Sequence, residues 1–585
     1  MVEWMEHEAL QYMQLYERLN PERDVPLTCT ATIAELADIL YCTPRNVKFV
    51  LRKLEERSWI NWQPGRGRGN HSQLEFRCHH HELVEQQLEH LLSRDRVKDA
   101  LELTGTMEND EPFRERLWQR INIYLGLHRE QEESSTQDVL RMIRYRPLEE
   151  LNTVKVFTAF EVFLLRQLFD TLVCYDPQQE DFVPRIAHRW EANDTFTEWT
   201  FYLRKGIRFH DGSLLTARDV YSTVQRLRQR GRNISWLYSD MDEVIVHTDY
   251  TLTFCLAQPN AMFLHLLSNI FMGIVPEHEQ GDETLNGSGP FRIAQRSASK
   301  LSLIAFDGYY GFRPMLDRVD VWFMPDEGHS NRYYRLSNGR EEDEQYSRLI
   351  NQPAQGGRYM LFNFNLPGVQ HEAAFRQAIR LLYDRETMRR ELGGDRISSA
   401  GSFLPWQSAK MSFPEIPLEQ VRQQLTQSSY AGETLKLTFV DKYEERREAE
   451  WLQQRAQQVG LQLELEPQER KLIVGGHMVL AVEVLEDDWE WDLINYFSNE
   501  ANYLHHMLGA EQLQQIHEML YDIMRKEQEQ RRQRLTQIVE RLQQENWLLF
   551  GNHINQRAYF NRNLYGLHLD SFGFPNLSAL WIKNR

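Results

Sequence analysis

The stretch TIAELADILYCTPRNVKFVLRKLEERSWINW, Thr32 to Trp62, predicts two helices joined by a short turn and followed by a strand. In the first helix the apolar residues recur at i, i+3, i+4 and i+7, and Thr32 with Glu35 is a capping-box signature. In the second helix Thr43 is the expected N-cap, because Pro44 suits the first helical position. Two helices with so short a connection are typical of a helix-turn-helix.

The second helix has an apolar stripe and a polar outer face. The apolar stripe consists of Val47, Val50, Leu51 and Leu54, and the outward residues are Arg45, Asn46, Lys48, Arg52 and Lys53. The recognition helix of a helix-turn-helix places its N-terminal polar residues against base edges in the major groove. We therefore predict contacts with double-stranded DNA from Thr43, Arg45, Asn46, Lys48 and Arg52.

A glycine–arginine loop, WQPGRGRGNHS from Trp62 to Ser72, follows these helices. A dinucleotide fingerprint would need G-x-G-x-x-G opening a helix, whereas this loop has G-x-G-x-G and precedes the alternating strand 73–77. An isolated loop of this composition would be a solvated turn. A loop that follows a helix-turn-helix along the chain is the expected tip of a wing. We therefore predict that Arg66, Arg68 and Asn70 contact DNA.

The charge distribution agrees with this interpretation. The chain has a formal net charge of -18, which argues against general polyanion binding. Between Thr43 and Arg77, however, eight basic residues stand against three acidic ones. The basic residues are thus concentrated in the segment that is predicted to contact DNA.

The sequence predicts no metal site and no cofactor. The five cysteines lack CxxC spacing, which fits reduced thiols better than a zinc or disulfide framework. Cys78 is followed by His79, His80 and His81, but consecutive residues at the end of a strand point to opposite faces and do not readily form one compact site. We expect this run to be a polar corner between a strand and a helix.

The length of 585 residues predicts several domains. We expect a winged helix in residues 1–80, a helical connector ending in a polar linker (128–138) in residues 81–137, and a large domain in residues 138–585. The connector helices either brace the winged helix or pair two subunits as a homodimer. The acidic N-terminus has no signal-peptide pattern, and no apolar run is long enough to span a membrane, so we expect a cytoplasmic protein without membrane contact.

The large domain alternates short strands with helices, as in a mixed α/β fold. EWTFYLRKGIRFHDGSLLTARDVYSTVQRL (198–227) resembles the signature of the family 5 extracellular solute-binding proteins. GSGPFRI (287–293), the segment 358–388 and the late helix-to-strand segment 531–553 are similar to further family motifs in the same order. The resemblance implies a two-lobed, type II periplasmic-binding-protein-like domain. His210 and Asp211, in the FHDG turn, are interpreted as capping residues rather than a catalytic pair.

A winged helix ahead of such a receptor-like domain resembles the SgrR-type transcriptional regulators over nearly the full length. This resemblance implies a DNA-binding regulator that responds to a small molecule, with a sugar or sugar phosphate as one candidate. The alternative is the substrate-binding component of a peptide or solute ABC transporter. We find no G-x-S-x-G, H-E-x-x-H or P-loop motif, so we do not expect an enzyme.

Aromatic faces together with one amide suit a sugar or another polar organic ligand. Peptide receptors of this family place an acidic residue after an aromatic stretch, whereas Asn499 stands near that place here, which disfavours a free amine. Arg146 is a candidate partner for a phosphate group. The predicted ligand-binding residues are Trp406, Trp491, Tyr496, Asn499 and Arg146.

Overall fold

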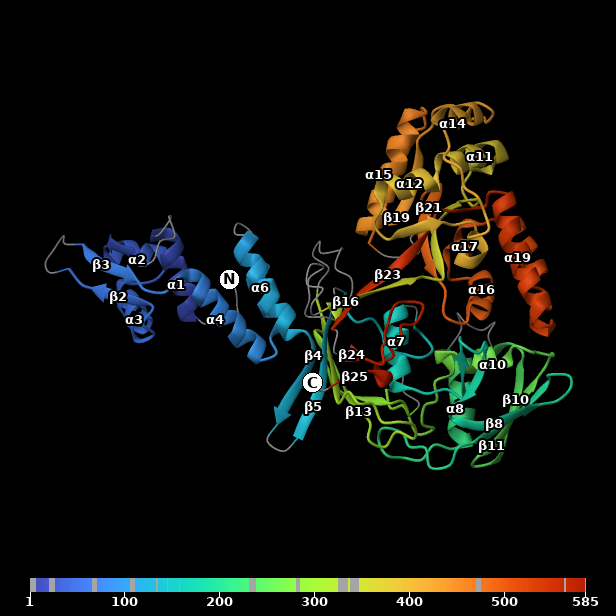
Figure 1. Ribbon diagram of the computed structural model, residues 1–585, viewed down its shortest axis with the longest axis horizontal. Helices are drawn as coiled ribbons and strands as arrows, with labels where there is room; N and C mark the ends of the chain where they lie inside the picture. The colour runs from blue at the N-terminus through green and yellow to red at the C-terminus, as the bar shows by residue number, and fades with distance from the viewer. Residues whose placement is uncertain are drawn as a thin grey trace. The chain divides into compact units, whose positions relative to one another are not determined.

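The computed structural model (Figure 1) describes residues 7–19, 27–65, 71–105, 111–132, 135–144, 146–156, 158–230, 238–279, 285–324, 335–336, 347–469, 475–561 and 564–583. The chain forms two compact units, Met1–Gly126 and Leu127–Arg585, which are described separately. Among the described residues, no helix combines the length and the apolar character that crossing a bilayer requires.

The first unit opens with a winged helix. Its elements are α1 (His7–Leu19), β1 (Leu27–Ala31), α2 (Ile33–Ile39), α3 (Pro44–Glu56), β2 (Ile60–Gln63) and β3 (Ser72–Phe76). The strands form an antiparallel sheet in the order β1-β3-β2. The predicted helix pair and hairpin are confirmed, whereas α1 and β1 were not predicted. The capping box is also present, since Thr32 N donates to Glu35 Oε2 at 2.7 Å and Glu35 N donates to Thr32 Oγ1 at 3.2 Å.

Helix α1 completes the core of the winged helix with two buried tyrosines. The rings of Tyr12 and Tyr16 meet Phe76 of β3 edge-on, at centroid distances of 5.6 and 5.3 Å. Trp59 packs against Tyr12 at 5.8 Å. Edge-to-face pairs of this kind add to the burial of their apolar area, so α1 is held on the sheet by ring packing.

Three further helices belong to the same compact unit: α4 (His80–Ser93), α5 (Val97–Gly105) and α6 (Glu111–Tyr124). The helical pattern predicted after residue 81 is therefore present.

The linker predicted at 128–138 is wrong, because β4 (Gly126–Glu132) and β5 (Ser135–Arg144) lie there as neighbours in a sheet. Charged residues pair across this sheet, as Arg129 Nε with Asp138 Oδ1 at 2.8 Å and Arg318 Nη2 with Glu130 Oε2 at 2.7 Å. A polar composition is common in edge strands and does not exclude one.

The second unit has two lobes, and two sheets build the first. One is the sheet β12-β13-β14-β5-β4, and the other is β10-β11-β9-β8. The elements of this lobe are α7 (Ala159–Leu168), β6 (Val173–Asp176), β7 (Asp181–Pro184), β8 (Ala187–Ala192), β9 (Glu198–Leu203), α8 (Ala217–Arg230), β10 (Met241–Thr248), β11 (Thr251–Leu256), α10 (Phe263–Ser268), η2 (Ile270–Met272), β12 (Phe291–Arg296), β13 (Lys300–Ala305) and β14 (Arg318–Phe323).

The second lobe is built around the sheet β20-β19-β21-β17-β22. Its strands are β17 (Gly356–Phe362), β19 (Leu435–Val440), β20 (Leu463–Gln468), β21 (Met478–Val484) and β22 (Leu548–Phe550). The helices that cover it are α11 (Ala373–Leu382), α12 (Arg385–Leu392), α13 (Pro405–Ser408), α14 (Leu418–Leu425), α15 (Tyr443–Gln458), α16 (Trp489–Ser498), α17 (Tyr503–Met507), α18 (Ala510–Leu520) and α19 (Gln528–Gln544). The late helix running into a strand, α19 into β22, is as predicted.

After the last strand of the second lobe, the chain returns to the first lobe through a strand of a separate sheet (Figure 1). This sheet contains β15 (Arg335–Leu336), β16 (Ser347–Pro353), β18 (Arg396–Ser399) and β23 (Asn552–Asn561). After β23 the chain ends in β24 (Leu564–Tyr565) and β25 (Trp581–Ile582), and Phe574 and Leu577 join the first lobe's core. The chain therefore passes from the first lobe to the second and returns, the connectivity that permits hinged closure.

The glycines of the GSGPF segment lie against the end of α7. Gly289 N donates to Leu168 O at 2.9 Å. A Cβ at Gly287 would stand 2.0 Å from Leu168 O, and one at Gly289 would stand 2.5 Å from Gln167 O. Glycine is therefore required at both positions, because any side chain would push the two backbones apart.

His210 of the FHDG turn holds the same segment. Gly287 N donates to His210 Nδ1 at 3.3 Å, and His210 Nε2 donates to Gly289 O at 3.1 Å. This arrangement needs a neutral ring, and burial lowers the pKa of His210 to about 4. Its neighbour Asp211 accepts from Ser213 N at 2.8 Å, which is a turn-capping contact. His210 therefore connects its turn to the GSGPF segment, and Asp211 caps its own turn, so both have the structural role expected from the sequence.

Gly287→Ala should destabilise the second unit, since the added Cβ meets backbone and not a movable side chain. We expect the free energy of unfolding to fall by about 1–3 kcal/mol in urea denaturation. Gly475→Ala is the matched control, because its Cβ would find its nearest neighbour, Glu466 Oε2, only at 3.9 Å. Equal stability of the two variants would contradict the steric argument.

The neutral His210 ring should make stability depend on pH. The unfolded chain takes up this proton near pH 6.5, whereas the folded chain resists it until about pH 4. The stabilisation is therefore fully present above pH 6.5 and is lost as the pH falls toward 4. We expect urea unfolding of His210→Gln to show a weaker pH dependence in this window than the parent, and His188→Gln, at an exposed strand position, to match the parent.

Candidate nucleic-acid interface and interlobe site

Helix α3 presents the predicted DNA-binding residues to solvent. Thr43 caps the helix, its Oγ1 accepting from Asn46 N at 3.4 Å. The apolar stripe of the helix is buried, as predicted. The predicted contact residues of this helix are all exposed: Thr43, Arg45, Asn46, Lys48 and Arg52. The wing residues Arg66, Arg68 and Asn70 lie outside the described residues.

Two basic residues of α3 have intramolecular partners. Arg52 Nε lies 2.9 Å from Glu56 Oε1, but the arginine side chain is 78% exposed. So exposed a pair contributes little and can exchange for a phosphate. Lys53 pairs with Glu8 of α1 and is half-buried, so it braces the domain.

The base of the wing is fixed to α3. Trp62 N donates to Glu55 Oε1 at 2.8 Å, and Gly65 N donates to Ser72 Oγ at 3.1 Å. Within the hairpin, Asn61 Nδ2 donates to Glu75 Oε2 at 3.0 Å. The hairpin therefore starts from a defined position beside the C-terminal end of the exposed helix.

Sequence reasoning passed over two exposed aromatic residues beside these positions. Tyr41, in the turn between α2 and α3, is 90% exposed and has a left-handed backbone with φ 48°. Phe49 of α3 is 57% exposed. The prediction for the outer face of α3 contains polar residues alone, although Phe49 stands outside the apolar stripe and this position is visible in the sequence.

The histidine run lies at the start of α4, and its geometry differs from expectation. The ring nitrogens of His79, His80 and His81 all lie within 4.8 Å of one another, so the argument that they point apart is wrong. The helix start turns the chain and brings the rings together. The rings are engaged in structure: His79 Nδ1 accepts from His81 N at 3.2 Å, His80 stacks on Tyr16, and His81 stacks on Phe113.

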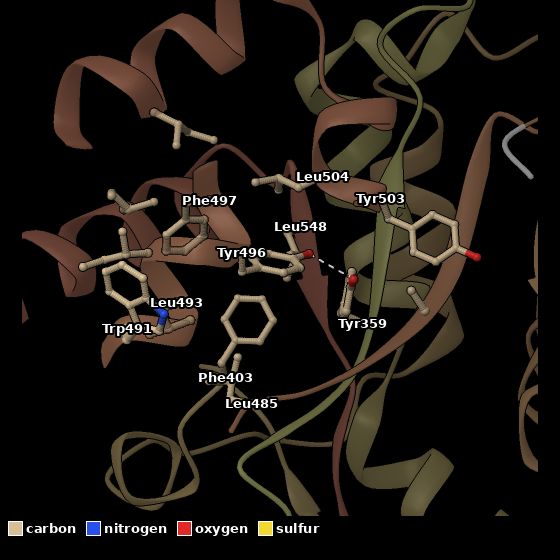
Figure 2. Packing of buried hydrophobic residues seen from close by; sticks show 14 of the residues in the cluster. Tyr359, Phe403, Leu485, Trp491, Leu493, Tyr496, Phe497, Tyr503, Leu504 and Leu548 are labelled. Carbon is tan, nitrogen blue, oxygen red and sulfur yellow. Dashed lines mark hydrogen bonds between the residues drawn. The ribbon is translucent and has the colours of Figure 1, made fainter. Parts of the chain in front are cut away.

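Two of the predicted ligand residues are core residues of the second lobe (Figure 2). Trp491 and Tyr496, both on α16, are each only 5% exposed. Tyr496 OH donates to Tyr359 OH at 3.0 Å, and its ring meets Phe403 edge-on at 5.1 Å. Tyr496 packs toward the sheet of the second lobe, where Tyr359 of β17 lies, whereas the Trp491 ring stacks on His265 of the first lobe.

The other three predicted ligand residues lie apart in the fold. Trp406 is 46% exposed and its ring meets Trp489 edge-on at 5.9 Å. Asn499 ends α16, where its Oδ1 accepts from Ala501 N at 2.9 Å. Arg146 follows β5 in the first lobe and is half-buried. Their role in binding stays a prediction.

Polar contacts join the two lobes around the start of α16. His265 Nδ1 of α10 lies 2.5 Å from Asp488 Oδ2, and the His265 ring stacks on Trp491 at 6.1 Å. Arg166 Nη2 of α7 lies 2.7 Å from Glu486 Oε2. Buried Phe263 of α10 belongs to the same hydrophobic cluster as Trp491. Apolar and ionic contacts thus hold the lobes together here.

Acidic residues gather at this junction, and basic residues pair with some of them, as Arg166 with Glu486 and Arg531 with Glu490. The acidic residues include Glu486, Asp487, Asp488, Asp492 and Asp570. Burial, with the neighbouring Glu486 charge, raises the pKa of Asp492 to about 8, and burial raises the pKa of Asp570 to about 6. Sequence reasoning missed this cluster, although the run EDDWEWD at 486–492 was its signal.

A shallow hollow of about 540 Å³ lies along α18, lined by Ala510, Leu513, Gln514, His517, Glu518 and Tyr521. None of these lining residues is among the predicted ligand residues. The hollow is therefore separate from the five positions chosen from sequence.

Two family models match the chain. Residues 181–500 match the bacterial extracellular solute-binding proteins, family 5 middle model, and residues 8–130 match the N-terminal model of the sugar transport-related sRNA regulator. Solved structures with the fold of the second unit include the oligopeptide-binding protein AppA of Bacillus subtilis with a nonapeptide (18% identity, 77% of this chain and 100% of that one, TM-score 0.62). NikA of Brucella suis with Fe(III)-EDTA is also similar (18%, 76% and 100%, TM-score 0.64).

Curated relatives extend the match to almost the whole chain. The uncharacterized protein YhjP of Bacillus subtilis (strain 168) is 30% identical over 569 residues, covering 94% of this chain and 96% of YhjP. The HTH-type transcriptional regulator SgrR of Photorhabdus laumondii is 31% identical over 50% of this chain and 51% of its own length. SgrR of Pectobacterium atrosepticum is 28% identical over 63% of each chain. The chain therefore spans from half to somewhat under two-thirds of these SgrR relatives, and it belongs to the family that joins an SgrR-type N-terminal domain to a family 5 solute-binding domain.

Proposed function

We propose that this protein is a cytoplasmic transcriptional regulator whose affinity for operator DNA changes when its two-lobed unit binds a small polar solute. The observation that carries the proposal is the exposed basic face of α3, in a winged helix that shares one chain with a receptor fold. The SgrR relatives are named as transcriptional regulators, which supports the same conclusion. A transporter's binding component would use the receptor fold but would leave this basic face without a role.

The DNA-binding step follows from the geometry of α3. The helix is capped at Thr43, so its first turn is ordered where a recognition helix meets base edges. Arg45 and Lys48 lie exposed on this first part of the helix, and Arg52 one turn later. Basic side chains at these positions neutralise phosphates and release counterions, which makes binding salt-dependent.

The sensing step follows from the two lobes. A solute that contacts both lobes favours their closure, and the lobes already meet through Arg166 with Glu486 and His265 with Asp488. If closure changes the winged helix's operator affinity, the two sites share a coupling free energy of ~1–3 kcal/mol.

Arg45→Ala should weaken operator binding by about tenfold or more, with a smaller salt dependence if the side chain contacts a phosphate. Fluorescence anisotropy with duplex DNA from upstream of the protein's own gene, over a series of salt concentrations, measures both effects. Arg94→Ala, at an exposed position just after α4, is the matched control and should bind like the parent. Parent-like binding by Arg45→Ala would oppose the assignment of α3.

A true ligand should stabilise the protein and alter DNA binding together. In a thermal-shift panel of sugars, sugar phosphates, amines and peptides, a ligand at 100 times its Kd contributes ~2.7 kcal/mol to stability. The same compound should change operator affinity in the anisotropy assay. A compound that stabilises the protein strongly but leaves operator affinity unchanged would refute the coupling.

A further inference from the structure

The exposed side of α3 includes an aromatic residue, Phe49. Successive helical residues are 100° apart, so Arg45, Phe49 and Arg52 lie on the side opposite the buried stripe of Val47, Val50, Leu51 and Leu54. Asn46 and Lys48 lie on either flank of these three residues. Along the helix axis, Phe49 lies between the two arginines on this exposed side, and it is 57% exposed.

The Phe49 ring has no function in the core of the domain. The buried stripe of α3 and the rings of α1 already fill the core. The Lys53 ammonium lies 5.1 Å from the centre of the Phe49 ring, and it also pairs with Glu8. This cation–π contact holds the ring in place while more than half of its surface remains in water.

The charges around the ring identify its partner as nucleic acid. Arg45 precedes it by one turn, Arg52 follows it, and Lys48 lies beside it, all exposed. An apolar protein partner would have to bury these cations, whereas the major groove of DNA places phosphates on both sides of the base edges. The apolar group that the major groove offers is the C5 methyl of thymine, and phenylalanine is one of the side chains that contact it.

We propose that Phe49 is a specificity residue that reads a thymine methyl group in the operator. The inference rests on the proposed DNA binding and adds to it a particular base preference, supplied by an apolar contact between two arginines. Asn46, one of the predicted contact residues, then acts from the flank of the face.

The test uses the full-length protein and an operator selected by it from a random duplex library. Each thymine of that operator is replaced in turn by deoxyuridine, which removes only the methyl group. We expect one or two positions at which the parent loses about fourfold in affinity, the effect of burying one methyl-sized group. Phe49→Ala should bind more weakly than the parent and be insensitive to uracil at those same positions, and Phe49→Leu should keep part of the sensitivity.

Ile123→Ala, which alters another exposed apolar residue of the same unit, is the control and should reproduce the parent's profile. Identical uracil profiles for the parent and Phe49→Ala would overturn the inference. If that occurs while Arg45→Ala still weakens binding, the proposed function stands and only the role of Phe49 is wrong. If the parent selects no sequence, the proposed function fails and this inference fails with it.

Discussion

The backbone contact between Gly287–Gly289 and the end of α7 is the constraint on which the receptor-like unit depends. No residue with a Cβ fits there, since the neighbouring atoms are peptide groups of Gln167 and Leu168. The contact brings α7, the FHDG turn and the start of β12 to one place, and His210 closes it with hydrogen bonds to both glycines. The first lobe's sheet and the helix that supplies Arg166 to the other lobe are thereby held in register.

The winged helix depends on a different division, between a buried and an exposed side of α3. Val47, Val50, Leu51 and Leu54 bury one side of α3, and that burial forces the remaining side chains into solvent. The exposed side combines cations with Phe49, a mixture that suits a groove containing phosphates and methyl groups. Folding of the domain therefore also determines which side chains of α3 are exposed.

The junction between the two lobes is rich in charged groups. In this chain the start of α16 is rich in carboxylates, two of which have raised pKa values because of burial. Keeping such groups buried costs stability unless a partner compensates for them.

The sequence by itself determined the elements whose signals are local. Helix caps at Thr32 and Thr43, the apolar stripe of α3, the alternating strand of the hairpin and the GSGPF turn are each specified within a few residues, and the structure has them. The tertiary structure decided the rest. Residues 135–138 belong to a strand because β5 pairs with β14, which lies far away along the chain, and strand pairing leaves no local signal in a polar segment. Tyr496 is a core residue because Tyr359 and Phe403 meet it from other parts of the lobe. An aromatic residue looks the same in sequence whether it fills a core or lines a pocket, since only the packing of distant segments determines which side of it remains open.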